Sequence, residues 1–229
     1  MKISINQPAY LPWLGYYERI AASDLHVVLD HVQFEKNSFI NRNRIKTKNG
    51  PIWLTIPVLT SGRFQSLPID QVIVDNRSDW KRKHWESINQ AYGKSPYFFM
   101  CEAFLKEFYA AEWDLLLEYC MHSNKYILNL LSIKTPLILS SELGITSKKT
   151  NLVLDICKKL GATTYYSGAL GKNYLDKDAF QANGIEVVYQ DYPHPVYKQM
   201  GVPFVSHLST LDLMCNHGPE SLGIINGAS

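Results

Sequence analysis

The chain has 229 residues, 46% of them hydrophobic and 19% charged, with a formal net charge of +2 at pH 7. This balance excludes a disordered chain, and so small a charge gives no reason to expect a nucleic-acid partner. No apolar run approaches membrane-spanning length and the N-terminus turns polar too early for a signal peptide, so we expect a cytoplasmic protein without membrane insertion. The four cysteines are widely spaced, which indicates reduced core thiols and no zinc or redox motif.

The first 75 residues predict a strand, loop, helix and strand in that order. An apolar run at 3–5 leads into an aromatic, proline-rich turn at 7–16, and a helix is expected over 11–22. A second apolar run at 25–29 ends at Asp30. This order opens nucleotide-binding-type α/β sheets, in which ligands lie outside the C-terminal ends of the strands. We therefore expect the active site at those ends.

Residues 38–58 alternate between polar and apolar side chains on both sides of Asn49-Gly50. A two-residue Asn-Gly loop between alternating runs is a strong hairpin signal, so we predict a β-hairpin attached to the sheet. A loop over 59–70 and a short strand over 71–74 follow. Helical spacing then predicts a three-helix insertion or cap within 78–131, with helices at 78–91, 97–109 and 113–131.

The alternation of strands and helices resumes over 136–229. We expect strands at 137–139, 163–166 and 185–189, helices at 148–160, 175–182 and 209–216, a loop at 190–206 and a loosely held tail after Pro219. The prediction is one domain of α/β class. It has a Rossmann-like, mostly parallel doubly wound sheet, with an added β-hairpin and a helical insertion.

The first candidate binding group lies in the N-terminal turn. The polar side chain of Gln7 follows a buried strand and needs a partner, and aromatic rings nearby can stack on a sugar or base face. The alternative is that the prolines shape the turn while the rings pack on the helical insertion. The group comprises Gln7, Tyr10, Trp13 and Tyr16.

The second candidate group begins at Asp30, whose carboxylate at a strand end can hold a substrate hydroxyl, a metal or a water, or act as a base. Cations on the neighbouring hairpin suit a phosphate or carboxylate. The alternative is that Arg42, Arg44 and Lys46 guard an edge strand against aggregation, and we favour it for Arg44 and Lys46. The candidate binding residues beside Asp30 are His31, Lys36, Asn41, Arg42, Asn43 and Lys46.

Two later loops complete the candidate site. The loop after the strand at 163–166 holds Ser167, Gly168 and Tyr174, but it lacks both the dinucleotide and the P-loop fingerprints, and an ordinary turn is the alternative. In the loop at 190–206, His194 stands between two prolines near Tyr197. A histidine on such a stiff loop can act as general acid or base, although a structural role is the alternative.

Together these segments resemble the WbqC-like family, which is found with bacterial surface-polysaccharide (O-antigen) gene clusters. The resemblance covers nearly the whole chain. It implies a role in building or decorating an unusual sugar on a nucleotide-sugar. The motifs that carry it are Gln7-Pro8-x-Tyr10-x-Pro12-Trp13-x-Gly15-Tyr16, Asp30 to Phe34, Asn41-Arg42-Asn43-x-Ile45, Leu160-Gly161-Ala162, Tyr166-Ser167-Gly168, His194-Pro195-x-Tyr197 and Leu208-Ser209-x-Leu211-Asp212.

The order of elements is also similar, at the level of topology, to HIGH-type nucleotidyltransferases and pantoate–amine ligases. Those enzymes transfer a nucleotide or adenylate a carboxylate. Their His-x-Gly-His motif is replaced here by Trp13-Leu14-Gly15-Tyr16, which lacks the imidazoles of their ATP chemistry. The likeness therefore bears on fold more than on mechanism.

We expect a transferase that attaches an acyl or aminoacyl group to the amine of a nucleotide-linked amino or deoxy sugar. Arg42 and Lys46 would bind a phosphate or carboxylate, and Asp30 or His194 would accept the amine proton. The expected partners are the nucleotide-sugar and an acyl or aminoacyl donor; no cofactor or metal ligand set is evident. One alternative is nucleotidyl transfer or carboxylate adenylation with ATP or CTP and Mg²⁺. Another is a non-catalytic nucleotide-sugar-binding or scaffold protein.

Overall fold

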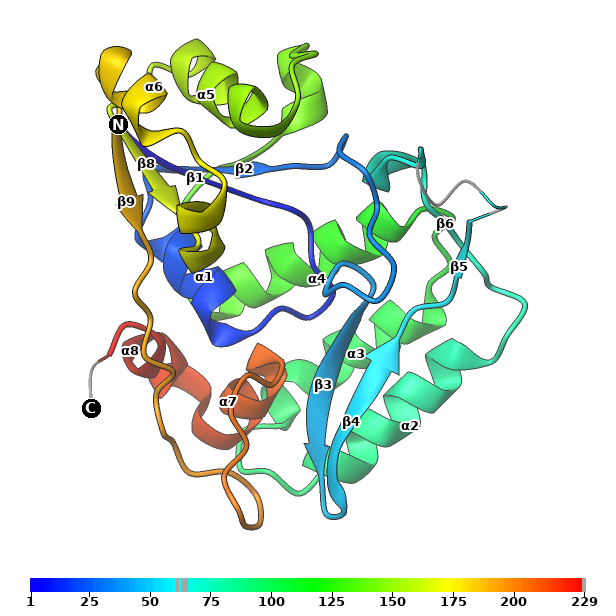
Figure 1. Cartoon of the computed structure of the whole chain (residues 1–229). Helices are drawn as coiled ribbons and strands as arrows, with labels where there is room; N and C mark the ends of the chain where they lie inside the picture. Colours follow the sequence, from blue (N-terminus) through cyan, green and yellow to red (C-terminus); the bar gives the residue numbers. More distant parts are fainter. Residues whose placement is uncertain (61, 63–65, 228–229) are drawn as a thin grey trace.

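Five parallel strands form the central sheet in the order β7–β2–β1–β8–β9 (Figure 1). The computed structural model describes residues 1–60, 62 and 66–227. In chain order the sheet reads 3-2-1-4-5, the order of Rossmann-like doubly wound sheets, so the predicted fold class is confirmed. The strands are β1 (Lys2–Asn6), β2 (Leu25–Val28), β7 (Leu137–Leu139), β8 (Thr164–Ser167) and β9 (Glu186–Tyr189).

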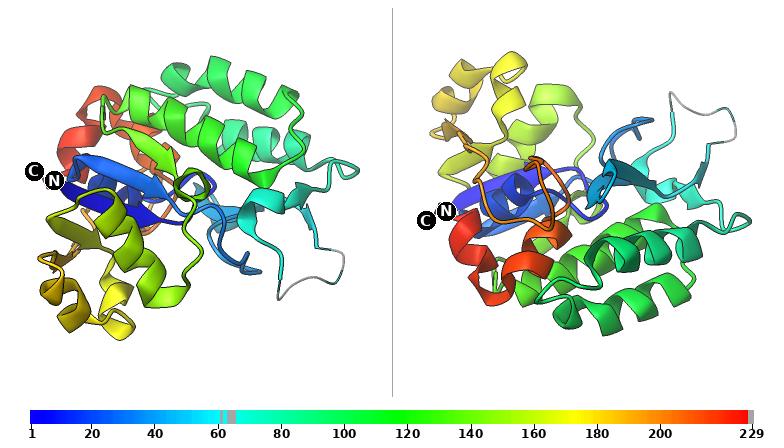
Figure 2. Two further views of the ribbon diagram at one scale, coloured as in Figure 1. Left: turned by 90° about the horizontal axis from the view of Figure 1, so that it is seen from above. Right: turned by 90° about the horizontal axis from the view of Figure 1, so that it is seen from below.

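Helices cover both faces of this sheet (Figure 2). On one face lie α1 (Leu14–Ala21) and α4 (Leu116–Leu130), and on the other lie α5 (Lys149–Lys159) and α6 (Lys177–Ala182). Side chains of a strand alternate between faces, so Ile3 and Ile5 of β1 pack with the apolar residues of α5 and α6. The intervening Ser4 points toward α1, where its Oγ lies 2.8 Å from Nδ1 of the fully buried His26.

The hairpin forms a two-stranded sheet of its own, β3 (Arg42–Thr47) with β4 (Gly50–Thr55). The prediction of a hairpin is confirmed, but its attachment to the central sheet is wrong, because β3 packs against α2 (Trp80–Tyr92) instead. The turn residues are Lys48 and Asn49, since Thr47 pairs with Gly50. Gly50 therefore follows the turn and has a φ of +109°. The sequence predicts Asn49 and Gly50 as the two turn residues, so the turn lies one position earlier than expected.

The strand predicted at 71–74 is shorter than expected. A 3₁₀ turn spans Ile69–Gln71, and only β6 (Ile73–Val74) is extended, pairing antiparallel with β5 (Val58–Leu59). The backbone N–H of Val74 also donates to the carbonyl of Asp114. Residues 61 and 63–65 of the predicted loop at 59–70 lie outside the described residues.

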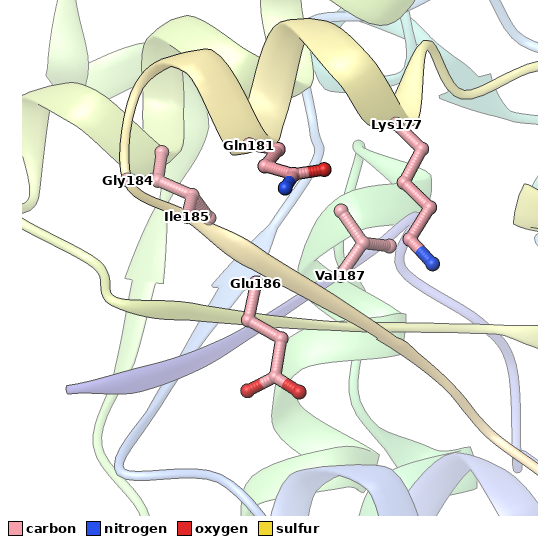
Figure 3. Close-up of a pocket in the computed structure, with 6 residues that line it drawn as sticks. All are labelled: Lys177, Gln181, Gly184, Ile185, Glu186 and Val187. Atoms are coloured by element: carbon pink, nitrogen blue, oxygen red, sulfur yellow. The ribbon is translucent and has the colours of Figure 1, made fainter.

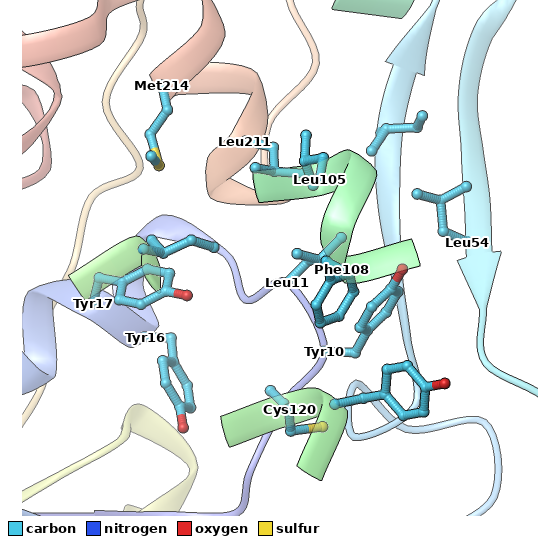
Figure 4. Close-up of a cluster of buried hydrophobic side chains, with 14 of the residues drawn as sticks. Tyr10, Leu11, Tyr16, Tyr17, Leu54, Leu105, Phe108, Cys120, Leu211 and Met214 are labelled. Atoms are coloured by element: carbon cyan, nitrogen blue, oxygen red, sulfur yellow. The ribbon is translucent and has the colours of Figure 1, made fainter. Parts of the chain in front are cut away.

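The three helices of the insertion are confirmed as α2, α3 (Phe99–Ala110) and α4. They enclose an aromatic core that also receives Tyr10 and Leu11 from the N-terminal turn, next to Phe108 and Cys120 (Figure 4). All four cysteines are buried free thiols, as predicted. The insertion therefore does more than cap the domain, because α4 also covers one face of the sheet.

Residues 220–227 are held more firmly than the sequence predicts; residues 228 and 229 of the predicted tail lie outside the described residues. After α7 (Thr210–His217), a short helix α8 (Ser221–Ile225) packs against α1 and buries Ile225. The Ser221 hydroxyl donates to the carbonyl of Gly218 over 2.6 Å. Across the described ranges, no helix is long and apolar enough to cross a membrane.

Candidate functional site

The direction of winding reverses between β1 and β8, and ligands of such sheets bind outside the strand ends at this switch point. Ser4 of β1 pairs with Tyr166 of β8, so the next residues along the two strands run side by side to their C-terminal ends. Gln7 follows β1 and is half-buried, whereas Ser167 and Gly168 close β8. Three predicted binding residues thus lie at the ends of the two strands that flank the switch point.

Arg19 of α1 also reaches this place, and the sequence reasoning missed it. Its side chain is only 7% exposed, and a Cβ atom at Gly168 would overlap its Nη1, so the guanidinium lies directly on the backbone that ends β8. Burial lowers the pKa of Arg19. A cation between Tyr16 and Ile20 in an apolar helix pattern is the sequence signal that could have identified it.

Glu18 lies beside this arginine without pairing with it. Its carboxylate accepts hydrogen bonds from the Tyr166 hydroxyl, at 3.0 Å, and from Nε2 of Gln190, which also donates to the Gly15 carbonyl at 2.7 Å. The nearby hydroxyl of Tyr192 is buried without a hydrogen-bond partner among the described residues. Glu18 is therefore a second acidic candidate that sequence reasoning did not select.

Trp13 packs in an aromatic cluster at the start of α1. Its ring stacks on His207 at 5.3 Å and on His194 at 6.4 Å, with Tyr192 edge-on at 5.7 Å. His194 Nε2 accepts the His207 backbone N–H, and Nδ1 lies 2.9 Å from the Pro195 carbonyl. Both nitrogens of the predicted catalytic imidazole are thus engaged by backbone groups, and burial lowers its pKa.

Two further predicted residues hold the loop that carries His194. The Tyr197 hydroxyl donates to Asp212 over 3.0 Å, and both side chains are buried. Nζ of Lys46 donates to the carbonyl of Gly201 over 2.8 Å. Tyr197 thus fastens the loop at 190–206 to α7, and Lys46 fastens it to the hairpin.

Asp30 lies elsewhere, at the end of β2, and is 1% exposed. Its Oδ1 accepts from the Ser140 hydroxyl at 2.8 Å and the Ser141 amide at 2.9 Å, and its Oδ2 accepts from the Ser141 hydroxyl at 2.6 Å. His31 Nδ1 lies 2.7 Å from the same Ser140 hydroxyl. Within the described part of the chain, no hydrogen bond, ion pair or ring contact joins Asp30 to His194 or to the hairpin residue Arg42. The two predicted catalytic residues do not contact each other.

Of the predicted hairpin residues, Asn41 and Asn43 are buried and Arg42 is half-buried. Nδ2 of Asn41 donates to Ile56 at 2.9 Å, and Nδ2 of Asn43 donates to Leu11 at 2.6 Å, so both amides are used within the fold. Arg42 instead stacks on the exposed indole of Trp53 at 4.3 Å. Lys36, in the turn before the hairpin, is exposed.

The remaining candidates are aromatic. Tyr10 and Tyr16 are 0% and 3% exposed, and the Tyr10 hydroxyl bonds to Nδ1 of His84 at 3.0 Å and to Tyr109. This geometry favours the packing interpretation for both. Tyr174, by contrast, is 56% exposed and follows the turn that begins at Gly168.

Two surface depressions are lined by residues other than these candidates. One is at the outer edge of the sheet and is lined by Lys177, Gln181, Gly184, Ile185, Glu186 and Val187 (Figure 3). A second lies beside α4 and includes Lys125 and Asn129. Among the residues that the structure describes, no group of three histidine, cysteine or acidic side chains could hold a metal ion.

Comparison with known proteins agrees with the sequence resemblance. The model of the WbqC-like protein family matches residues 7–224. The chain is 33% identical, over 230 residues, to an uncharacterized protein of Mycobacterium tuberculosis, Rv1507c, with 96% of this chain and 95% of that protein covered. No solved structure matches the chain. The family model spans nearly the whole sequence, and the chain belongs to the WbqC-like protein family.

Proposed function

We propose that the chain is a transferase acting on a nucleotide-linked amino or deoxy sugar in surface-polysaccharide or related glycan biosynthesis. It joins an acyl or aminoacyl group to the sugar amine. The observation that carries the proposal is the 3-2-1-4-5 sheet, because nucleotides bind sheets of this order at the switch point, which lies here between β1 and β8. Gln7, Ser167 and Gly168 stand at that point.

The sugar would extend from the switch point toward the aromatic cluster. Glu18 and Tyr192 lie between the end of β8 and Trp13, since Tyr192 contacts the Trp13 ring and Glu18 bonds to Tyr166 of β8. Aromatic rings and hydroxyl groups suit the mixed apolar and polar faces of a sugar. Tyr174, exposed beyond Gly168, would cover the ligand from the opposite side.

The reaction needs a proton acceptor. The amine nitrogen attacks the acyl carbonyl carbon, a C–N bond forms, and the bond to the donor's leaving group breaks with its electron pair. The amine proton must then pass to a base. Asp30 is 1% exposed and Nε2 of His194 accepts a backbone N–H, whereas Glu18 is half-buried and lies near the switch point. The proposal therefore assigns the base to Glu18, with the hydrogen bonds from Tyr166 and Gln190 orienting its carboxylate.

A thermal-shift panel tests the binding, because a ligand that binds only the folded state raises Tm by mass action. The panel holds UDP-, dTDP- and GDP-sugars, ATP, CTP and acyl donors, each with and without Mg²⁺. A hit with one amino-sugar nucleotide, followed by an acylated product in mass spectrometry, supports the transferase. Stabilisation only by ATP or CTP with Mg²⁺ supports nucleotidyl transfer, and binding without product under any donor supports a scaffold.

Glu18→Gln tests the base. The amide keeps hydrogen-bonding capacity but cannot accept a proton at neutral pH, so turnover should fall by about 100-fold or more while nucleotide-sugar binding persists. Glu86→Gln, on the exposed face of α2, is the matched control and should leave turnover unchanged. Full turnover in Glu18→Gln would remove Glu18 from this role.

A further inference from the structure

Arg19 carries a buried positive charge that forms no ion pair with an acidic side chain among the described residues. The residue is 7% exposed, and no carboxylate oxygen lies within ion-pair distance of its guanidinium among the described residues. Its Nε is buried without a hydrogen-bond partner in that part of the chain. An uncompensated buried charge is costly, so a charge kept in this state indicates a partner that comes from outside the chain.

The neighbouring acid does not supply that partner. Glu18 is adjacent in sequence, but its carboxylate is committed to the Tyr166 hydroxyl and to Gln190, and no ion pair joins it to Arg19. The other groups around the guanidinium are the tyrosines 16, 165 and 166, whose pKa values burial raises. These phenols are neutral at pH 7. The Glu18 carboxylate raises the Arg19 pKa through space, but burial outweighs this effect and no ion pair forms.

The position of the guanidinium is specific. It rests on Gly168, where any side chain would overlap Nη1. Gly168 ends β8 at the switch point, so the charge lies where the sheet order places a ligand. A guanidinium presents a planar fork of N–H donors that matches the oxygens of a phosphate group.

We propose that Arg19 is the anchor for an oxyanion at the switch point, and specifically for the diphosphate of a nucleotide-linked ligand. The nucleotide part of this assignment rests on the proposed function. The anion part rests on the guanidinium alone. A side chain at position 168 would displace this guanidinium.

Binding measurements with Arg19→Met and Arg19→Lys test the anchor, by calorimetry with UDP, dTDP, CDP, GDP and inorganic pyrophosphate as probes. Methionine fills the space without charge, so affinity for the preferred diphosphate should fall about 10- to 100-fold, with a smaller loss in the lysine variant. Arg82→Met removes an exposed arginine of α2 and should leave affinity unchanged. The Tm of ligand-free Arg19→Met should rise by about 2–4 °C, because the uncompensated charge is gone. If Arg19 had only a structural role, Arg19→Met would lower Tm.

The outcomes separate the anchor from the proposed function. Unchanged diphosphate affinity in Arg19→Met overturns the anchor while leaving the transferase proposal intact. Arg19-dependent binding of pyrophosphate, without acylation of any amino-sugar nucleotide, supports the anchor and overturns the transferase. If the wild-type protein binds none of the five probes, the anchor is wrong.

Discussion

The backbone N–H of His207 donates to Nε2 of His194 over 3.0 Å. This bond needs an unprotonated Nε2, and Nδ1 faces the Pro195 carbonyl at 2.9 Å, so the imidazole is held in its neutral form with the proton on Nδ1. The other groups near the ring are Trp13, Phe204, Tyr197 and the His207 ring, none of them acidic. The loop over Trp13 therefore depends on a neutral histidine.

This arrangement predicts acid sensitivity of folding. The pKa of His194 is lowered by burial, and burial also lowers the pKa of His26 to about 3 and that of His84 to about 4. These histidines bind protons more readily in the unfolded chain, so the free energy of unfolding is constant above about pH 6.5 and falls as the pH drops below it. Protonation of His26 and His84 should together lower the free energy of unfolding by about 2–4 kcal/mol between pH 6.5 and 5.

Urea denaturation at about pH 7, 6 and 5 measures this loss. Asp70 and Asp212, whose pKa values burial raises, take up protons earlier in the folded state and offset part of it at the acidic end. In His84→Gln, which cannot titrate, the slope should be shallower than in the wild type. A stability that stays flat from pH 7 to 5 would contradict the neutral-imidazole account.

Asp30→Asn should destabilise the fold. The carboxylate accepts the hydroxyls of Ser140 and Ser141 and the Ser141 amide, and an Asn side chain would place an NH₂ group against one of these donors. We expect a loss of about 1–3 kcal/mol in the free energy of unfolding, measured by urea denaturation. Asp24→Asn is the control: this exposed carboxylate accepts one hydrogen bond, from the Lys2 amide, and an Asn oxygen can also accept it, so stability should change little. An Asp30→Asn protein with wild-type stability and no turnover would instead support the catalytic role predicted from the sequence.

The sheet could be predicted because its strands are short apolar runs punctuated by glycine, proline and polar residues, and their order follows from the alternation with helices. The docking of the hairpin could not be predicted. Alternation in 42–55 defines two faces, but whether the apolar face meets a sheet or α2 depends on contacts far apart in sequence. The packing of the C-terminal segment could not be predicted either, because α8 is a five-residue helix that depends on tertiary packing.

The candidate site was predicted less fully than the fold. The position of Gln7, Ser167 and Gly168 at strand ends follows from the topology alone. Asp30 and His194 were chosen for chemistry at strand ends, and sequence could not reveal that serine hydroxyls and a backbone amide already use their lone pairs. Arg19 was missed because it lies in an apolar helix pattern, and the sequence gives no sign that its guanidinium contacts the distant Gly168.

Gly15→Ala should disturb the Trp13 cluster. A Cβ atom at Gly15 would overlap the six-membered ring of the Trp13 indole, which lies flat over this glycine. Alanine favours a helix by up to about 1 kcal/mol, but forcing the indole away from His207 should cost about 1–3 kcal/mol, so the net effect is destabilising. Thermal unfolding followed by tryptophan fluorescence measures it. In a Trp13→Ala background the same change should stabilise the helix; a cost that persists there would show that the clash is not the cause.

Asn43→Ala should loosen the hairpin from the N-terminal turn. Asn43 is 1% exposed, its Nδ2 donates to the Leu11 carbonyl at 2.6 Å, and its Oδ1 accepts the Arg44 amide at 2.8 Å. Alanine leaves both backbone groups without these partners, so the free energy of unfolding should fall by about 2–4 kcal/mol. Leu11 has a φ of +45°, an unfavourable backbone conformation for a leucine. The hydrogen bond from the Asn43 side chain helps to hold Leu11 in this conformation. Asn49→Ala, at the exposed hairpin turn, should cost under about 0.5 kcal/mol. Equal losses in the two variants would mean that the buried amide does not fasten the hairpin to the turn, and amide hydrogen exchange at Arg44 would locate the loosening directly.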